Sequence, residues 1–171
     1  MEHELLHEVD ENDAVIGTRT RAELHRLGLR HRAVHILVFN SASELFLQKR
    51  SASKDINPGL WDISAAGHVD LGESYDAAAR RELAEELGID GASTLRLLFK
   101  MPSSPETGWE FIQVYSATHD GPLVLNAAEI SEGRWISAPE LDNWIQQGGE
   151  GLTLSFQSLW HTFQQKYRYT P

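Results

Sequence analysis

Apolar and polar positions along the chain form short strand-like runs separated by longer stretches with helical spacing. Val34–Phe39 is a continuous apolar run, which is typical of a strand buried on both faces. Within Glu110–Ala117, the side chains of Phe111, Gln113 and Tyr115 would face one side of a sheet and those of the intervening residues the other. Similar, shorter runs predict the remaining strands: Leu5–Val9, Val15–Gly17, Leu45–Leu47, Leu60–Ala65, Leu95–Phe99 and Arg134–Ile136.

Capping residues and helical spacing predict four helices between these runs. Thr20 and Glu23 match a capping box, which predicts a short helix through about Leu27. Ser74–Leu87 is rich in Ala, Glu and Arg, which favour helices, and Gly88 is suited to end it. The C-terminal part predicts two more: Leu141–Gln147, entered through Pro139, and Ser155–Tyr167, with Phe156, Leu159, Trp160 and Phe163 along one stripe. Strands and helices in alternation predict an α/β layered domain.

Length and composition are those of one globular domain. The chain has 171 residues, of which 41% are hydrophobic and 23% charged, and no Pro/Gly/Ser-rich linker divides it. We therefore expect a single domain over residues 1–171. Its N-terminal extension would cover residues 1–30 and its C-terminal helices residues 138–171.

The charge balance narrows the possible partners. With 25 acidic and 15 basic residues the formal net charge is −10, which disfavours binding to duplex nucleic acid. A phosphate-bearing substrate would need a local inversion of charge, for which a bound divalent metal is suited. The acidic N-terminus is no signal peptide, and no apolar run approaches the roughly 18 residues of a membrane helix. A cytoplasmic protein with no membrane partner is therefore expected, with its oligomeric state left open.

Three carboxylates in the central predicted helix carry the strongest chemical signal. Glu82, Glu85 and Glu86 are spaced i, i+3, i+4 and so share one helix face, where like charges repel by a few tenths of a kcal/mol. They also lie toward the C-terminal end, where the helix dipole disfavours anions. Taken alone, the cluster could be a solvated acidic face. Bound Mg²⁺ or Mn²⁺ would relieve the repulsion, since both prefer carboxylate oxygens.

The segment around these carboxylates matches a longer pattern. Gly67 is followed after five residues by Glu73, and after seven more by Arg81-Glu82, an apolar residue, any residue, Glu85-Glu86, any residue, Gly88 and apolar Ile89. This pattern resembles the box of the Nudix hydrolase family at every fixed position. The resemblance implies the Nudix fold, an α/β architecture with a mixed β-sheet sandwiched between α-helices, and residues 67–89 as a loop–helix–loop.

The same resemblance implies roles for the box residues. Glu82, Glu85, Glu86 and the carbonyl of Gly67 would bind Mg²⁺ or Mn²⁺, while Glu73 and Arg81 would form an internal pair that orients the helix. Water would attack a phosphorus of a diphosphate linkage. Its proton would go to Glu86, to Glu85, or to an acid from a loop outside the box. Glu129 and Glu132, in the predicted loop 126–133, are candidates for that acid or for a further ligand.

Residues flanking the box resemble the isopentenyl-diphosphate isomerase branch, which shares the fold. Arg50 and Lys54 match its diphosphate-binding basic pair. His25, His31, His68 and Glu110 lie near or at its metal-binding positions, although Gly108 stands where a companion acid is expected. Ala66 replaces the proton-transfer cysteine of that branch, and the chain contains no cysteine at all. The missing thiol and the complete box both favour hydrolysis over isomerisation.

The expected function is therefore metal-dependent hydrolysis of a small organic diphosphate. A nucleoside di- or triphosphate is favoured, with a slight preference for pyrimidines. The alternatives are a nucleotide sugar, a coenzyme or a prenyl diphosphate as substrate, isopentenyl-diphosphate isomerisation, and a nucleotide-sensing module. Trp61 is expected to pack beside the active loop. Four other aromatic side chains could stack on a nucleotide base: Trp109, Trp135, Trp144 and Tyr115.

Overall fold

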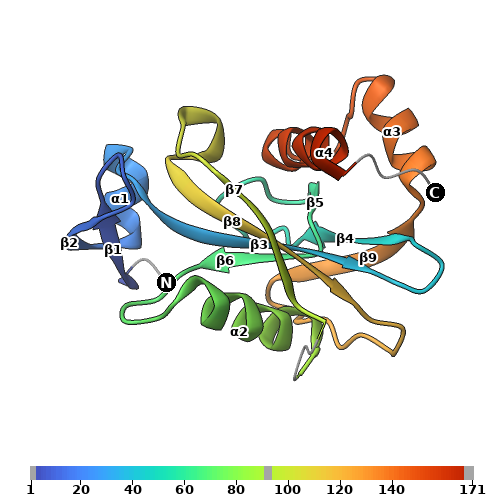
Figure 1. Cartoon of the computed structure of the whole chain (residues 1–171), viewed down its shortest axis with the longest axis horizontal. Helices are drawn as coiled ribbons and strands as arrows, with labels where there is room; N and C mark the ends of the chain where they lie inside the picture. The colour runs from blue at the N-terminus through green and yellow to red at the C-terminus, as the bar shows by residue number, and fades with distance from the viewer. Residues whose placement is uncertain (1–2, 91–93, 168–171) are drawn as a thin grey trace.

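A mixed β-sheet lies between helices on its two faces. The computed structural model describes residues 3–90 and 94–167. Helix α2 (Tyr75–Leu87) covers one face of the sheet, and α3 (Ala138–Gln146) and α4 (Leu154–Tyr167) lie on the other (Figure 1). Within the described residues, seven strands make up this sheet: β3 (His31–Phe39), β4 (Leu45–Arg50), β5 (Trp61–Asp62), β6 (Ala65–His68), β7 (Arg96–Met101), β8 (Glu110–Thr118) and β9 (Ile130–Ile136).

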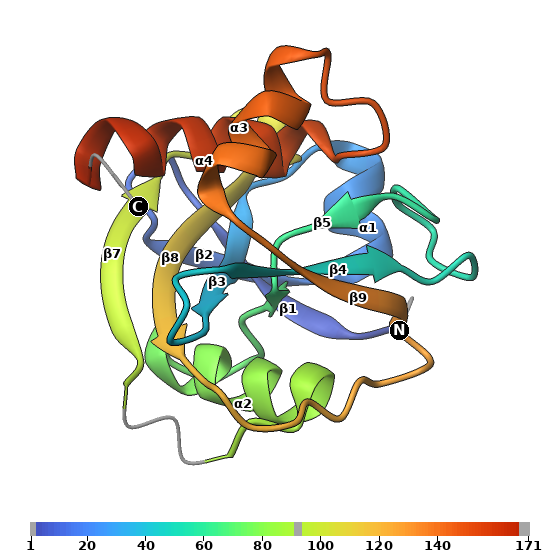
Figure 2. The same cartoon turned by 90° about the vertical axis from the view of Figure 1, so that its right-hand side faces the viewer.

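Strand β3 is the centre of the sheet. It pairs in parallel with β8 from His31↔Glu110 to Phe39↔Thr118, and antiparallel with β6. Strand β4 pairs with β3 only at Phe39↔Leu45, and then continues antiparallel to β9 and β5. Because β3 and β4 pair only at that point, their far ends separate, and Figure 2 shows β4 running away from β3.

The core has two parts because both faces of β3 are buried. One face packs Val34, Ile36 and Val38 toward α2, whose Leu83 and Leu87 are fully buried. The other face belongs to a cluster under α3 and α4. It contains the whole predicted apolar stripe of the last helix: Phe156, Leu159, Trp160 and Phe163. The continuous apolar run predicted for this strand is thus explained by two helical layers.

The structure confirms the predicted mixed sheet between helices, although some strand boundaries differ from the prediction. The predicted strand Leu60–Ala65 is wrong, since the chain forms two short strands there, β5 and β6. β5 pairs with β4, and β6 pairs with β3, so the chain changes partner between them. The buried Ser64 occupies this crossing, where its Oγ donates to the carbonyl of Phe46 at 2.6 Å and accepts from the amide of Val38 at 2.9 Å.

Residues 3–30 are folded against one end of the sheet. Strands β1 (Leu5–Val9) and β2 (Val15–Thr20) form an antiparallel hairpin, and α1 (Arg21–Leu27) follows. Thr20 and Glu23 make both bonds of the predicted capping box. A short 3₁₀ turn, η1 (Pro105–Thr107), precedes β8. Over the described ranges 3–90 and 94–167, no helix has the length and apolar character needed to span a membrane.

Asp13 ties the hairpin to the sheet and to α2. Its side chain is 8% exposed and accepts hydrogen bonds from Arg32 Nε at 2.6 Å, from the hydroxyl of Tyr75 at 2.7 Å, and from the Lys100 ammonium. Burial acts to raise the pKa of Asp13, but these three donors and the charge of Arg32 outweigh it and hold the pKa below its usual value.

Asp13→Ala is expected to destabilise the fold by about 2–4 kcal/mol, because it leaves two cations and the Tyr75 hydroxyl without their common acceptor. The lowered pKa means that the stabilisation is complete above the unfolded-state value near 4 and is lost as the pH falls through the folded-state value. Urea unfolding between pH 3 and 7 should therefore show a gap between wild type and variant that shrinks in acid. Asp120→Ala, which removes one exposed bond to Ser41 N, is the control. An equally small loss in both variants would contradict the prediction.

Candidate active site

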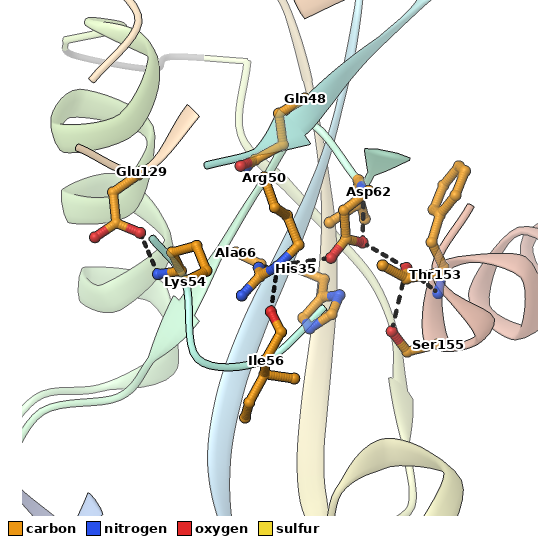
Figure 3. A network of polar contacts seen from close by, with 12 residues as sticks. His35, Gln48, Arg50, Lys54, Ile56, Asp62, Ala66, Glu129, Thr153 and Ser155 are labelled. Atoms are coloured by element: carbon orange, nitrogen blue, oxygen red, sulfur yellow. Dashed lines mark hydrogen bonds and ion pairs between the residues drawn. The ribbon is translucent and has the colours of Figure 1, made fainter. Parts of the chain in front are cut away.

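A cleft of about 1280 Å³ opens beside the diverging ends of β3 and β4. It is bounded by α1, the β4–β5 loop, β6, the C-terminal half of α2, and the start of α4. Its lining includes box carboxylates, basic side chains and histidines. Figure 3 shows part of this lining, with side chains from β3, β4 and the β4–β5 loop turned toward one another.

The three box carboxylates all line the cleft, but they differ in exposure. Ser74 caps the start of α2, and Gly88, with φ 67°, ends it, so the helix presents Glu82 and Glu86 on its buried side. Glu86 accepts from Gln48 Nε2 at 2.7 Å and from the amide of Ala66 at 3.2 Å. Glu82 accepts from Arg81 Nη1 at 2.6 Å, whereas the side chain of Glu85 is 57% exposed.

Burial makes two of these carboxylates reluctant to ionise. Burial raises the pKa of Glu82 to about 7, against the opposing charge and hydrogen bond of Arg81. Burial, and then the charge of Glu82, raise the pKa of Glu86 well above its usual value. A bound cation would stabilise the ionised form of these two neighbouring buried carboxylates. Their hard oxygen donors are the ligands that Mg²⁺ and Mn²⁺ prefer. The donor set therefore fits a divalent metal.

Arg81 connects the box helix to the loop before it. Its Nε and Nη2 donate to the two carboxylate oxygens of Glu73 at 2.9 and 3.0 Å, and Nη2 also donates to the carbonyl of His68 at 2.9 Å. Burial acts to raise the pKa of Glu73, but the Arg81 and Asp70 hydrogen bonds lower it below its usual value. The structure thus brings Glu73 and Arg81 together as a bidentate pair beside Glu82.

Gly67 lies against the carboxylate of Glu82. A Cβ atom at residue 67 would lie 2.0 Å from Glu82 Oε1 and 2.1 Å from its Cδ, far inside van der Waals contact. The requirement for glycine is therefore one of space, because only a residue without a side chain allows this carboxylate to reach the strand.

Gly67→Ala is expected to displace the Glu82 carboxylate and to lower Mn²⁺ affinity and hydrolysis about 10²-fold, with a folded protein retained. Metal titration by calorimetry and initial rates measure the effect. The matched control is Gly17→Ala, where the nearest atom to a new Cβ would be Glu8 Oε2 at 3.5 Å, an ordinary contact. Metal affinity that stays unchanged in Gly67→Ala would show that the placement of Glu82 does not matter.

A second group of potential ligands lies in the same cleft. The ligating atoms of His25, His31, His68 and Glu110 all lie within 4.8 Å of one another, although they come from α1, β3, β6 and β8. Glu110 Oε1 lies 3.1 Å from His68 Nε2 and 3.5 Å from His31 Nε2. The parallel pairing His31↔Glu110 explains how two residues so distant in sequence come together.

This group also fits a metal. His31 Nδ1 lies 2.9 Å from the carbonyl of Leu29, which can only accept, so Nδ1 carries the proton. The opposite nitrogen, Nε2, is buried and has no hydrogen-bond partner within the part of the chain that the structure describes. Burial, followed by the charges of its neighbours, lowers the pKa of His25 to about 4. Burial acts to raise the pKa of Glu110, but the neighbouring imidazoles of His31 and His68 lower it overall. Imidazole nitrogens around an anionic carboxylate suit a divalent transition metal.

Basic side chains line the same cleft as the box carboxylates. Arg50 Nε donates to the carbonyl of Ile56 at 2.9 Å, and its Nη1 lies 3.7 Å from Asp62 Oδ2. Lys54 forms an ion pair with Glu129 (Figure 3). The structure therefore brings both predicted diphosphate-binding residues into the cleft, each already held by an acid.

Of the two later acids, only Glu129 lines the cleft. Placing Glu132 in a loop is wrong, because β9 begins at Ile130 and pairs Glu132 with Lys49. The Lys49 ammonium lies 3.0 Å from Glu132 Oε1 in an exposed ion pair.

The aromatic candidates lie mostly elsewhere. Trp109 lines the cleft, but the guanidinium of Arg30 lies 5.4 Å from its ring centroid, and its indole packs against Gly28. Tyr115 is 1% exposed in the core. Trp135 packs on Phe46, Trp144 lies beneath Arg134, and Trp61 packs against the core cluster under α4.

Sequence reasoning gave no role to two residues that line the cleft, His35 and Asp62, or to Gln48, which contacts Glu86. Gln48, 4% exposed, orients Glu86, and Asp62, 6% exposed, accepts from Thr153 Oγ1 at 3.1 Å while facing Arg50. The sequence signal that could have identified them is a polar residue inside a mostly apolar strand. Burial of such a residue is unfavourable unless it has a hydrogen-bond partner or contributes to a site.

Comparisons with known proteins agree with this geometry. Residues 29–154 match the model of the NUDIX domain. An uncharacterised Nudix hydrolase of Pseudomonas aeruginosa is 47% identical over 81% of this chain and 80% of its own length. An isopentenyl-diphosphate Delta-isomerase of Photorhabdus laumondii is 33% identical over 91% and 90%. The crystal structure of DR0079 from Deinococcus radiodurans covers 96% of this chain and 100% of its own, with 33% identity and a TM-score of 0.81. The chain is therefore a member of the Nudix hydrolase family, and a pyrophosphohydrolase.

Proposed function

We propose that this protein is a divalent-metal-dependent hydrolase that cleaves the diphosphate linkage of a nucleoside di- or triphosphate. The observation that carries the proposal is the convergence of Glu82, Glu85 and Glu86 with Arg50 and Lys54 on one cleft. Acidic ligands for a metal and cations for phosphate oxygens are the two elements that hydrolysis of a diphosphate needs.

The chain's own residues suggest a division of labour. Glu82, Glu85, Glu86 and the carbonyl of Gly67 would hold Mg²⁺ or Mn²⁺, which neutralises phosphate oxygens and lowers the pKa of bound water. Arg50 and Lys54 would bind the diphosphate, Lys54 by exchanging its partner Glu129 for a phosphate oxygen. A water oxygen forms the new bond to phosphorus, the bridging P–O bond breaks, and a neighbouring carboxylate accepts the proton. Glu85, Glu86 and the released Glu129 are the candidates for that base.

Prenyl-diphosphate chemistry is the second candidate, and the histidine cluster favours it. His25, His31, His68 and Glu110 are placed together, and one relative is named an isopentenyl-diphosphate isomerase. Isomerisation in that branch relies on a thiol, and residue 66 is alanine in a chain with no cysteine. The complete box argues against a pure nucleotide sensor. We therefore place hydrolysis first, with pyrimidine nucleotides as the first substrates to test and the cytoplasm as its setting.

A substrate panel tests the proposal. Nucleotides, nucleotide sugars, coenzymes and isopentenyl and longer prenyl diphosphates are incubated with Mg²⁺ or Mn²⁺, and phosphate release is measured with and without added pyrophosphatase. We expect turnover of at least one nucleoside diphosphate compound and its complete loss in EDTA. Tight binding of a compound without turnover of any would overturn the hydrolase assignment, and isomerised isopentenyl diphosphate would select the second candidate.

A further inference from the structure

His35 is an unexpected residue in the most buried strand of the protein. Its neighbours Val34 and Ile36 are 0% exposed, and His35 itself is 7% exposed. Its Nδ1 is buried and has no hydrogen-bond partner among residues 3–90 and 94–167, and Nε2 comes no closer than 4.0 Å to Glu110 Oε2. Packing alone would favour an aliphatic residue at this position, since an unpaired buried polar atom destabilises the fold.

The imidazole of His35 lies where it can contact a ligand in the cleft. His35 pairs with Ala66 across β3 and β6, so the two side chains project from the same face of the sheet. That face is the cleft, and His35, Ala66, Arg50 and Asp62 all line it (Figure 3). The direct partner Ala66 is small, so its side chain leaves room beside the ring. His35 thus lies next to a strand partner whose amide holds Glu86 on one side, and close to Glu110 on the other.

The buried ring offers a hydrogen-bonding group that the described residues leave without a partner. The side chain of His35 is 9% exposed and lines the cleft, so a ligand that enters the cleft can reach the edge of the ring. An imidazole N–H can donate to a phosphate oxygen, and Arg50 and Lys54 line the same cleft. An anionic ligand there supplies a hydrogen-bond partner to a ring that otherwise has none among residues 3–90 and 94–167.

We propose that His35 is a substrate-contacting residue that donates a hydrogen bond to the diphosphate held between Arg50 and the box carboxylates. The proposal rests on the proposed hydrolysis but adds a residue from β3 that the box does not include. It also explains why a strand with aliphatic neighbours retains a histidine.

His35→Val tests this, because valine suits a buried strand and removes the donor. Binding of the non-hydrolysable diphosphate methylenediphosphonate, measured by calorimetry with Mg²⁺, should weaken about tenfold, and KM for whichever substrate the panel identifies should rise similarly. The melting temperature should stay level or increase, because an unpaired buried polar group is lost. His35→Asn, which keeps an N–H, should recover part of the binding.

The control is His161→Val, on the exposed side of α4, which should leave binding and KM unchanged. Wild-type affinity for methylenediphosphonate in His35→Val, with the fold retained, would overturn the proposal even if the enzyme hydrolyses diphosphates. If His35→Val does not fold, the comparison passes to His35→Asn and His35→Gln, and wild-type affinity in both would overturn it. The absence of turnover in the wild type would instead overturn the proposed function, while the binding measurement still decides the role of His35.

Discussion

Glu86→Gln is expected to lower kcat about 10³-fold while leaving the fold intact. Glu86 is the most enclosed of the three box carboxylates, and its two oxygens are already oriented by Gln48 and by the amide of Ala66. An amide of the same shape keeps the volume but removes the negative charge that a metal ligand supplies. Initial rates at saturating Mn²⁺ and the calorimetric metal affinity measure the change.

Two opposing effects determine the stability of Glu86→Gln. Glutamine removes a carboxylate whose ionisation is disfavoured by burial, which stabilises the metal-free protein at neutral pH. It also places an NH₂ group against a donor, either Gln48 or the amide of Ala66, which costs one hydrogen bond. We expect the melting temperature to change by no more than about 4 °C.

Glu132→Gln is the matched control for the same chemical change. Glu132 lies on β9, 56% exposed and paired with Lys49, and it does not line the cleft. Its activity should equal that of wild type. Full activity in Glu86→Gln, or a comparable loss in Glu132→Gln, would contradict the assignment of the box carboxylates.

Arg81→Lys is expected to destabilise the protein by about 2–3 kcal/mol and to lower kcat by about 10–100-fold. The guanidinium of Arg81 bonds Glu73 through two nitrogens while also reaching Glu82 and the carbonyl of His68. A lysine ammonium cannot make this planar set of bonds, so Glu73 and Glu82 would lose their common partner. Urea unfolding and kinetics with varied Mn²⁺ measure the two effects.

Arg96→Lys, at an exposed position on β7, serves as the control and should change neither quantity. Arg81→Lys with wild-type stability and wild-type metal dependence would show that the bidentate contact with Glu73 does not support the site.

The parts of the fold that follow from local sequence were predictable. Helix α2 is bounded by Ser74 and Gly88, which cap it in the structure, and its carboxylates share one side because they are spaced i, i+3, i+4. Prediction was limited where the chain changes strand partners. Leu60–Ala65 has the composition of one strand, but Asp62 pairs with β4 and Ala65 with β3, a choice made by tertiary contacts.

The site was predictable where its residues are contiguous in sequence. Long-range contacts were not: Lys54 and Glu129 are 75 residues apart, and Gln48 and Glu86 are 38 apart. The histidine cluster was suggested by the family resemblance alone, since no spacing rule joins residues from four elements. The aromatic candidates were predicted less well. A side chain such as Tyr115 could stack on a nucleotide base or pack in the core, and only the packing in the folded protein distinguishes the two.

Hydrolysis in ¹⁸O-labelled water tests the central claim most directly. The wild-type protein is incubated with Mn²⁺, the best substrate of the panel and isopentenyl diphosphate, and the products are analysed by mass spectrometry. We expect one ¹⁸O atom per turnover in a phosphate-containing product, with that product formed about 10³-fold more slowly in Glu86→Gln. Products without label in phosphate, or rearranged isopentenyl diphosphate with its diphosphate intact, would contradict it.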